Sequence, residues 1–458
     1  MSNTVRFIHS ADLHLGSPLK TLETMSKTLR QTLQEASFQA VKKLVDSALD
    51  LEVDFLLLSG DIYDRDARSV KANEFLAGQI ERLNKKGIPV CIIYGNHDPL
   101  GSTADLYKLP PNVKVFPWEN SECLIITNSN GIPLARVFGQ SYRNAAENRK
   151  MYATFAPPDS TIPNIGMLHT ALNPGAKNYI PCSLEDLRKV PNLHYWALGH
   201  IHHPCLYSSE IPVVAYPGIP QGRDPGEPGM GGCLLVEADI DRPAQVQFLP
   251  LSEIVWLNLE IPIKEEEPGD LDSLEELLVT KGQEIIAEGP ERFYPAIDTV
   301  AGASCPVKGY IARWEITGRG KLHEVIADQE QEELTETLEN RLRQSLGTGS
   351  PFLWTEAVAF KTAAPLPDIN TLAEQDFIFR TLIQQRSENQ QAFKDKNQQA
   401  LKKEMVAALG SIWYEQKDAE DLREDSIPLT EEKLEELLDR AQALVFDRII
   451  REREGIDY

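Results

Sequence analysis

The sequence lacks the features that would place it among membrane or secreted proteins. No apolar run approaches the roughly 20 residues that a membrane-spanning helix needs. The first ten residues contain no basic stretch followed by an apolar one, which is the pattern of a secretory signal peptide. We therefore expect a cytoplasmic chain that does not enter a membrane.

Cysteine is scarce, and a nucleotide-binding loop is missing. The six cysteines include no C-x-x-C pair, which argues against zinc ribbons and thioredoxin-type redox sites, and we expect free thiols. The sequence has no G-x-x-x-x-G-K-[ST] motif and no internal repeat. Any ATP hydrolysis linked to this chain would have to come from another protein.

The chain also lacks the excess of basic residues that marks many nucleic-acid-binding proteins. Its net charge is -23, but the charge is unevenly distributed. Residues 1–250 hold 26 acidic and 23 basic residues, a net charge of -3, whereas residues 251–458 hold 43 and 23, a net charge of -20. The first half is therefore nearly neutral, and bound divalent cations would make a site there locally positive.

The 458 residues are too many for one ordinary domain, and their patterning predicts three regions. Residues 1–250 alternate short apolar runs with amphipathic stretches, which is typical of an α/β domain with helices on its faces. Strand and helix patterns alternate again over residues 251–363, where we predict a small α+β cap domain. Residues 364–458 look helical, and their apolar stripe could pack within its own domain or on a partner's helix.

Five short polar blocks each follow a predicted strand of the first region. They are Asp12-Leu13-His14, Gly60-Asp61, Gly95-Asn96-His97-Asp98, His169 and Gly199-His200-Ile201-His202. In an open α/β sheet, groups at the carboxyl ends of strands converge on one crevice. Residues i and i+2 of an extended chain point the same way, so the D-x-H and H-x-H blocks can each present two ligands to one place.

The residue types in these blocks favour a pair of divalent ions. Imidazole, carboxylate and amide oxygen suit Mn, Fe or Zn better than Ca or Mg alone. One carboxylate can bridge two ions about 3.5–4 Å apart, as two-metal hydrolases require. Such a pair activates water and neutralises charge on a phosphate, which is the main need of phosphate-ester cleavage.

In this order, the five blocks resemble the calcineurin-like metallophosphoesterases, and more closely the SbcD- and YhaO-type DNA repair exonucleases. The closer match is carried by residues 8–16, residues 58–64, Tyr216-Pro217-Gly218 and Gln221-Gly222-Arg223. The resemblance covers residues 1 to about 250. It implies an α/β fold with an αββα sandwich core, and a two-metal DNA exonuclease. Mn would be the favoured ion, with Mg, Fe and Zn left open.

The resemblance also implies a role for each block. One ion would be held by Asp12, His14 and His202, the other by Asn96, His169 and His200, and Asp61 would bridge them. His97 would act as a general acid toward the leaving oxygen or stabilise the transition state. Asp98 would orient His97 by a hydrogen bond. Some nucleases of this family carry a histidine where this chain has Asp64, so its role is left open.

Several interpretations outside these blocks remain alternatives. Arg223 could contact a phosphate or be an exposed loop residue, and Tyr216 could stack on a base or pack in the core. His9 is predicted to be structural. The resemblance implies DNA ends as substrate, cleaved 3′ to 5′, with an SbcC- or YhaN-like coiled-coil ATPase as partner and a homodimer of this chain. The alternatives are an enzyme acting on small nucleotides or other small phosphoesters, and a catalytically minor scaffold for an ATPase.

Overall fold

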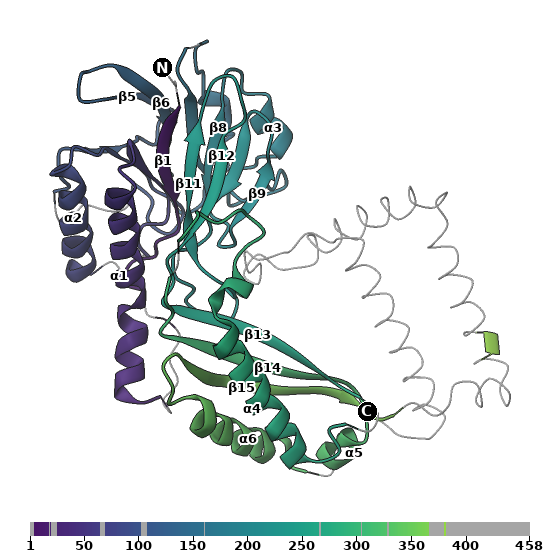
Figure 1. Ribbon diagram of the computed structural model, residues 1–458. Coiled ribbons are helices and arrows are strands. Elements are labelled where there is room, and N and C mark those ends of the chain that lie inside the picture. Colours follow the sequence, from purple (N-terminus) through teal and green to yellow (C-terminus); the bar gives the residue numbers. More distant parts are fainter. Residues whose placement is uncertain are drawn as a thin grey trace. The chain divides into compact units, whose positions relative to one another are not determined.

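A computed structural model describes residues 4–365 and 380–381, except residues 18, 20–24, 65–68, 102–107, 160, 265–266, 304 and 328 (Figure 1). The chain forms two compact units. The first comprises residues 1–260, 275–315 and 332–359, and the second comprises residues 261–274, 316–331 and 360–458. The helical region predicted for residues 364–458 lies almost wholly outside the described residues.

One six-stranded sheet of the first unit has the order β12-β11-β1-β2-β3-β4. Its strands are β1 (Val5–Ser10), β2 (Phe55–Ser59), β3 (Val90–Ile93), β4 (Val113–Val115), β11 (Gly232–Ala238) and β12 (Gln245–Pro250). The strands β1 to β4 pair in parallel, and β11 and β12 extend the sheet in antiparallel pairing. The side chains of β2 and β3 are all buried, as the near-continuous apolar runs of a covered parallel sheet predict.

The second six-stranded sheet has the order β5-β6-β7-β8-β10-β9. Its strands are β5 (Glu122–Thr127), β6 (Pro133–Gly139), β7 (Asn164–His169), β8 (Tyr195–Gly199), β9 (Cys205–Ser208) and β10 (Val213–Tyr216). The four central strands pair in parallel, whereas the edge strands β5 and β9 are antiparallel to their neighbours. The central strands thus end together at one edge of the sheet.

The two sheets face each other and carry helices on their outer sides. Phe7 of β1 meets Tyr195 of β8 edge-on, with ring centroids 5.5 Å apart. His9 lies fully buried between the sheets, with Nδ1 2.9 Å from the Tyr195 hydroxyl and Nε2 3.0 Å from the Leu198 carbonyl oxygen, a structural position. Outside the first sheet lie α1 (Lys27–Asp50) and α2 (Val70–Asn84), and the second sheet packs with η1 (Met151–Thr154) and α3 (Leu184–Arg188) (Figure 1). The predicted αββα sandwich is confirmed.

Helix α1 follows from its sequence. Ser26 caps it, since its side chain accepts a hydrogen bond from the Leu29 amide. Apolar residues recur at three- and four-residue spacing from Leu29 to Ala48 and form its buried face. The part of this face from Ala40 to Ala48 closes the apolar core beneath β1 and β2, which fixes the strands that end at the polar blocks.

A third sheet has the order β13-β14-β15. It is formed by β13 (Ile254–Ile263), β14 (Gly309–Arg319) and β15 (Phe352–Ala363), and the intervening helices are α4 (Leu271–Glu288), η2 (Pro290–Phe293), α5 (Leu322–Ala327) and α6 (Gln331–Leu346). The sequence pattern predicts a single helix from Glu324 to Leu346, which is wrong, because α5 ends at Ala327 and α6 begins at Gln331. None of the helices in the described ranges has both the length and the apolar character needed to cross a membrane.

Candidate metal centre

The five polar blocks lie where parallel strands end. The loop after β1 is tied to the loop after β2, because the Asp12 amide donates to the Gly60 carbonyl and the His14 amide to the Asp61 carbonyl, each at 3.0 Å. Four block residues other than glycine have a positive φ, namely Asp12 (52°), His14 (40°), Asp61 (49°) and His200 (101°). Such backbone is uncommon for residues other than glycine and gathers at functional sites, where the surrounding structure holds it in place.

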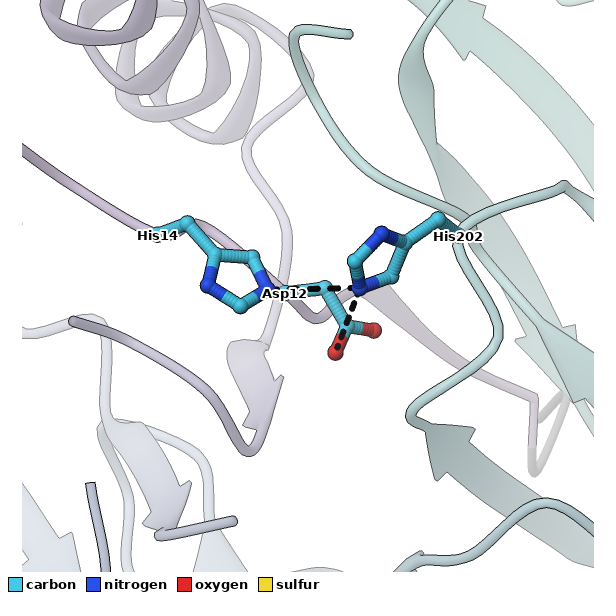
Figure 2. Close-up of side chains that lie close together, drawn as sticks. All are labelled: Asp12, His14 and His202. Atoms are coloured by element: carbon cyan, nitrogen blue, oxygen red, sulfur yellow. Dashed lines mark hydrogen bonds and ion pairs between the residues drawn. The ribbon is translucent and has the colours of Figure 1, made fainter. Parts of the chain in front are cut away.

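A first cluster consists of Asp12, His14 and His202 (Figure 2). All three are buried, the two Nε2 atoms are 3.2 Å apart, and His202 Nε2 lies 3.8 Å from Asp12 Oδ1. Each Nδ1 atom is hydrogen-bonded to a carboxylate at 2.7 Å: that of His14 to Asp64, and that of His202 to Glu227. With those nitrogens donating, both Nε2 lone pairs point to one place. Nitrogens about 2.1 Å from a shared ion lie roughly 3.0–3.4 Å apart, so this spacing suits two ligands of one cation.

A second cluster consists of Asn96, His169 and His200. The His169 Nδ1 donates to the Ser59 carbonyl at 3.0 Å, which directs Nε2 toward the Asn96 side-chain oxygen at 3.0 Å. The same Asn96 oxygen lies 3.1 Å from Nδ1 of His200. Both histidines are buried, and the ring of Tyr179 lies against His200 with centroids 4.7 Å apart. One amide oxygen and two imidazoles thus meet at one point.

Asp61 lies between the two clusters. Its Oδ1 accepts a hydrogen bond from the His97 amide at 3.0 Å. Its Oδ2 is 3.2 Å from His169 Nε2 and 4.0 Å from His14 Nε2, yet it is buried and makes no hydrogen bond with any described residue. Buried carboxylate oxygens are almost always hydrogen-bonded, so an Oδ2 that has only the ion-pair distances to His169 and His14 calls for a further partner. Its position between two imidazole-containing clusters fits a carboxylate shared by two cations.

The two histidines nearest Asp61 have pKa values shifted in opposite directions. Burial, reinforced by the charge of Arg223, lowers the pKa of His14 to about 4, so its imidazole is neutral and able to bind a metal at neutral pH. Burial also opposes the charge on His169, but the carboxylates of Asp61 and Asp12 outweigh it and raise the pKa of His169 to about 9. In the ion-free chain a proton on His169 therefore compensates Asp61, where a cation would do the same.

Two glycines leave room for these groups. A Cβ atom at Gly95 would overlap the Asp61 carboxylate, and one at Gly60 would overlap the His169 ring. Gly60 also has a φ of 96°, which side chains rarely tolerate. Both positions therefore require glycine for the ligands to approach each other.

The partner of His97 differs from the prediction. The Asp98 carboxylate accepts hydrogen bonds from the backbone amides of Ile62 (2.7 Å), Gly95 (2.9 Å) and Tyr63 (3.1 Å), so it fastens two loops rather than orienting His97. The carboxylate beside His97 is Asp64, whose Oδ1 lies 2.9 Å from His97 Nδ1. The difference arises because Asp98 is buried beneath the loop, whereas the His97 side chain is 39% exposed.

The two candidate substrate contacts also have other partners. Arg223 forms ion pairs with Asp64 at 3.0 Å and with Glu227 at 2.7 Å. Tyr216 is fully buried and its hydroxyl donates to the Thr170 carbonyl, so the core interpretation holds and stacking on a base does not. Sequence reasoning missed Glu227, because a glutamate in the loop Asp224-Pro225-Gly226-Glu227 looks like any solvated loop residue.

Comparisons with known proteins agree with this geometry. The family described as "Calcineurin-like phosphoesterase" matches residues 5–204. The uncharacterized metallophosphoesterase YhaO of Bacillus subtilis is 35% identical over 271 residues, which cover 58% of this chain and 65% of that protein. The DNA double-strand break repair protein Mre11 of Methanocaldococcus jannaschii is 28% identical, covering 46% of this chain and 55% of that protein. The Mre11 protein of Archaeoglobus fulgidus is 24% identical over 48% of this chain and 51% of its own length.

The chain therefore carries a calcineurin-like metallophosphoesterase domain, which confirms the predicted superfamily. The matched family is one of phosphoesterases, and the two clusters supply candidate residues for a dimetal site. The matches span less than two thirds of the length of these relatives.

Proposed function

We propose that this chain is a two-metal DNA exonuclease that works with a separate ATPase. The observation that carries the metal-dependent part is the buried Oδ2 of Asp61, which makes no hydrogen bond with a described residue and lies between imidazoles of the two clusters. One ion would be held by Asp12, His14 and His202, the other by Asn96, His169 and His200, and Asp61 would be shared. Mn is the favoured ion, with Mg, Fe or Zn as alternatives, since imidazole and carboxylate suit several of these metals.

The residues around the ions would divide the work of hydrolysis. Bound ions supply activation of water and neutralisation of charge on the phosphate. The His97 ring, oriented by Asp64 through Nδ1, would pass a proton from its other nitrogen to the leaving oxygen. Asp98 would keep the loop of His97 in place through its three backbone hydrogen bonds. Arg223 would act through Asp64 and Glu227 rather than on a phosphate.

DNA as substrate is supported by the relatives and by the sequence motifs. The Mre11 relatives are named as DNA double-strand break repair proteins, and residues 8–16 and 58–64 resemble the SbcD- and YhaO-type exonucleases. By the same resemblance we propose DNA ends as the site of attack, 3′-to-5′ polarity and a homodimer. The sequence has no P-loop, which is consistent with a partner ATPase of the coiled-coil SbcC or YhaN type.

A parallel assay tests this function. Purified chain, depleted of metal and then supplied with Mn²⁺, is given end-labelled linear duplex, closed circular duplex and bis-p-nitrophenyl phosphate, with and without the partner ATPase. We expect Mn-dependent shortening of the linear duplex from its 3′ ends, with the closed circle left intact. Turnover of the small ester with the linear duplex untouched, even with the ATPase present, would replace the nuclease by an enzyme for small phosphoesters.

A matched variant guards against contaminating nucleases. Asp12→Asn removes a carboxylate of the first cluster and adds no bulk, so the same purification should yield a folded protein without cleavage activity. Equal DNA shortening by the variant and the wild type would show that the activity belongs to another protein.

A further inference from the structure

Arg223 connects the two carboxylates that hold the imidazoles of the first cluster. Its Nη1 lies 3.0 Å from Asp64 Oδ2 and its Nη2 lies 2.7 Å from Glu227 Oε1. The other oxygen of Asp64 holds His14, and the Glu227 oxygen that meets Arg223 also holds His202. A continuous series of hydrogen bonds therefore runs from the His14 imidazole through Asp64, Arg223 and Glu227 to the His202 imidazole.

The guanidinium is suited to this position. Its donors form a rigid planar fork, and hydrogen bonds between charged groups are about twice as strong as neutral ones. The Glu227 side chain is only 7% exposed and is further held by the Arg223 backbone amide at 2.6 Å. Without the positive charge, two largely buried carboxylates would lack compensation, which favours their turning outward to water.

The second cluster has a different support. The ring of His169 is held by the backbone carbonyl of Ser59, and the Asn96 oxygen meets both imidazoles of the cluster. A backbone carbonyl at the end of a buried strand has no rotamer to change. The charged hydrogen bonds of Arg223, Asp64 and Glu227 therefore lead to the imidazoles of the first cluster.

We propose that Arg223 is a positioning residue that sets the affinity for one ion of the pair. By clamping Asp64 and Glu227 it fixes the 3.2 Å separation of the His14 and His202 nitrogens, and the ion at the second cluster does not depend on it. This inference rests on the proposed two-ion function. Loss of a group that holds a metal ligand by a hydrogen bond typically weakens metal binding about 10- to 100-fold.

Metal binding can be measured without any substrate. Mn²⁺ is titrated into metal-free full-length protein, the two dissociation constants are obtained by calorimetry, and electron paramagnetic resonance reports whether neighbouring ions are magnetically coupled. For Arg223→Met we expect one dissociation constant to rise about 10- to 100-fold and the other to stay unchanged. At an Mn²⁺ level that saturates the wild type, the coupled signal should give way to that of an isolated ion.

Two further variants make the test specific. Arg223→Lys keeps the charge but loses the planar fork, so the affinity at the first cluster should remain well below that of the wild type. Arg149→Met removes an arginine that forks onto Glu147 at 2.6 and 2.8 Å in another loop, and both constants should stay unchanged. Thermal unfolding of the metal-free proteins verifies that each variant is folded.

The outcomes separate this inference from the proposed function. A wild-type chain that binds fewer than two ions would overturn the two-ion function itself. Two ions in the wild type, together with unchanged constants in a folded Arg223→Met protein, would overturn the role of Arg223 alone. Equal loss of Mn²⁺ affinity at both sites would also contradict it, because that would be a general effect on the protein. Wild-type affinity in Arg223→Lys would contradict it too, because the positive charge alone would then be enough.

Discussion

Replacing Asp61 with asparagine removes the charge that the two clusters share. The substitution keeps the size of the side chain but turns the carboxylate beside His14 and His169 into a neutral amide. Neither cluster then retains its shared carboxylate. We expect Asp61→Asn to lose both ions, and with them at least about 10³-fold of the cleavage rate, since one preorganised electrostatic contact is alone worth about 10²–10³-fold.

The expected size of the effect on stability follows from the number of ions. At a free Mn²⁺ concentration about 100 times the dissociation constant, each ion adds about 2.7 kcal/mol to the free energy of unfolding. Two ions therefore add about 5 kcal/mol, which for a domain of this size raises the melting temperature by roughly 10–20 °C. In Asp61→Asn the shift caused by Mn²⁺ should nearly vanish.

Differential scanning calorimetry with and without Mn²⁺ measures this shift, and cleavage of labelled duplex is followed on the same samples. Asp54→Asn is a matched control, because Asp54 precedes strand β2 at the end opposite to Asp61 and accepts a hydrogen bond from the Arg6 amide at 2.8 Å. It should keep the full Mn²⁺ response. An Asp61→Asn protein that is stabilised by Mn²⁺ as strongly as the wild type would refute the shared-carboxylate argument.

Three other predictions follow from the site. His97→Ala should lower cleavage by about 10²–10⁴-fold with two ions still bound, and loss of metal in this variant would place His97 among the ligands instead. The affinity for Mn²⁺ should rise with pH up to about 9, because the ion must displace the proton that the carboxylates of Asp61 and Asp12 stabilise on His169. An affinity that calorimetry finds to be independent of pH would contradict this. Gly95→Ala should abolish Mn²⁺ binding, because the new Cβ atom would overlap Asp61. The control Gly78→Ala, in an exposed turn of α2, should stabilise the chain by about 0.5–1 kcal/mol. Two variants with similar melting curves in the presence of Mn²⁺ would refute the steric argument.

The sequence indicates which polar residues come together, because strand ends are locally encoded. Runs such as Phe55–Leu58 and Val90–Tyr94 are continuous stretches of apolar and aromatic residues and are followed by a polar, glycine-containing turn. Once the strands are parallel, their ends must meet, and the seven candidate ligands come together with them. The αββα layers follow from the same alternation of strands and amphipathic helices.

The parts that sequence reasoning missed depend on contacts that no local pattern encodes. Strands β5 and β6 were not predicted, and β5 has only one buried residue, Ile126, so it lacks the apolar run that marks a central strand. Asp64 and Glu227 acquire their roles from His14 and His202, which are 50 and 25 positions away. Asp98 adjoins His97 in the chain, but burial under the loop directs it to backbone amides.

Anomalous diffraction at the manganese edge, from crystals grown with Mn²⁺, tests the metal centre most directly. We expect two peaks about 3.5–4 Å apart, one at the Asp12, His14 and His202 side chains and one at Asn96, His169 and His200, with the Asp61 carboxylate between them. A single peak, or two peaks remote from Asp61, would contradict a pair of ions that share this carboxylate.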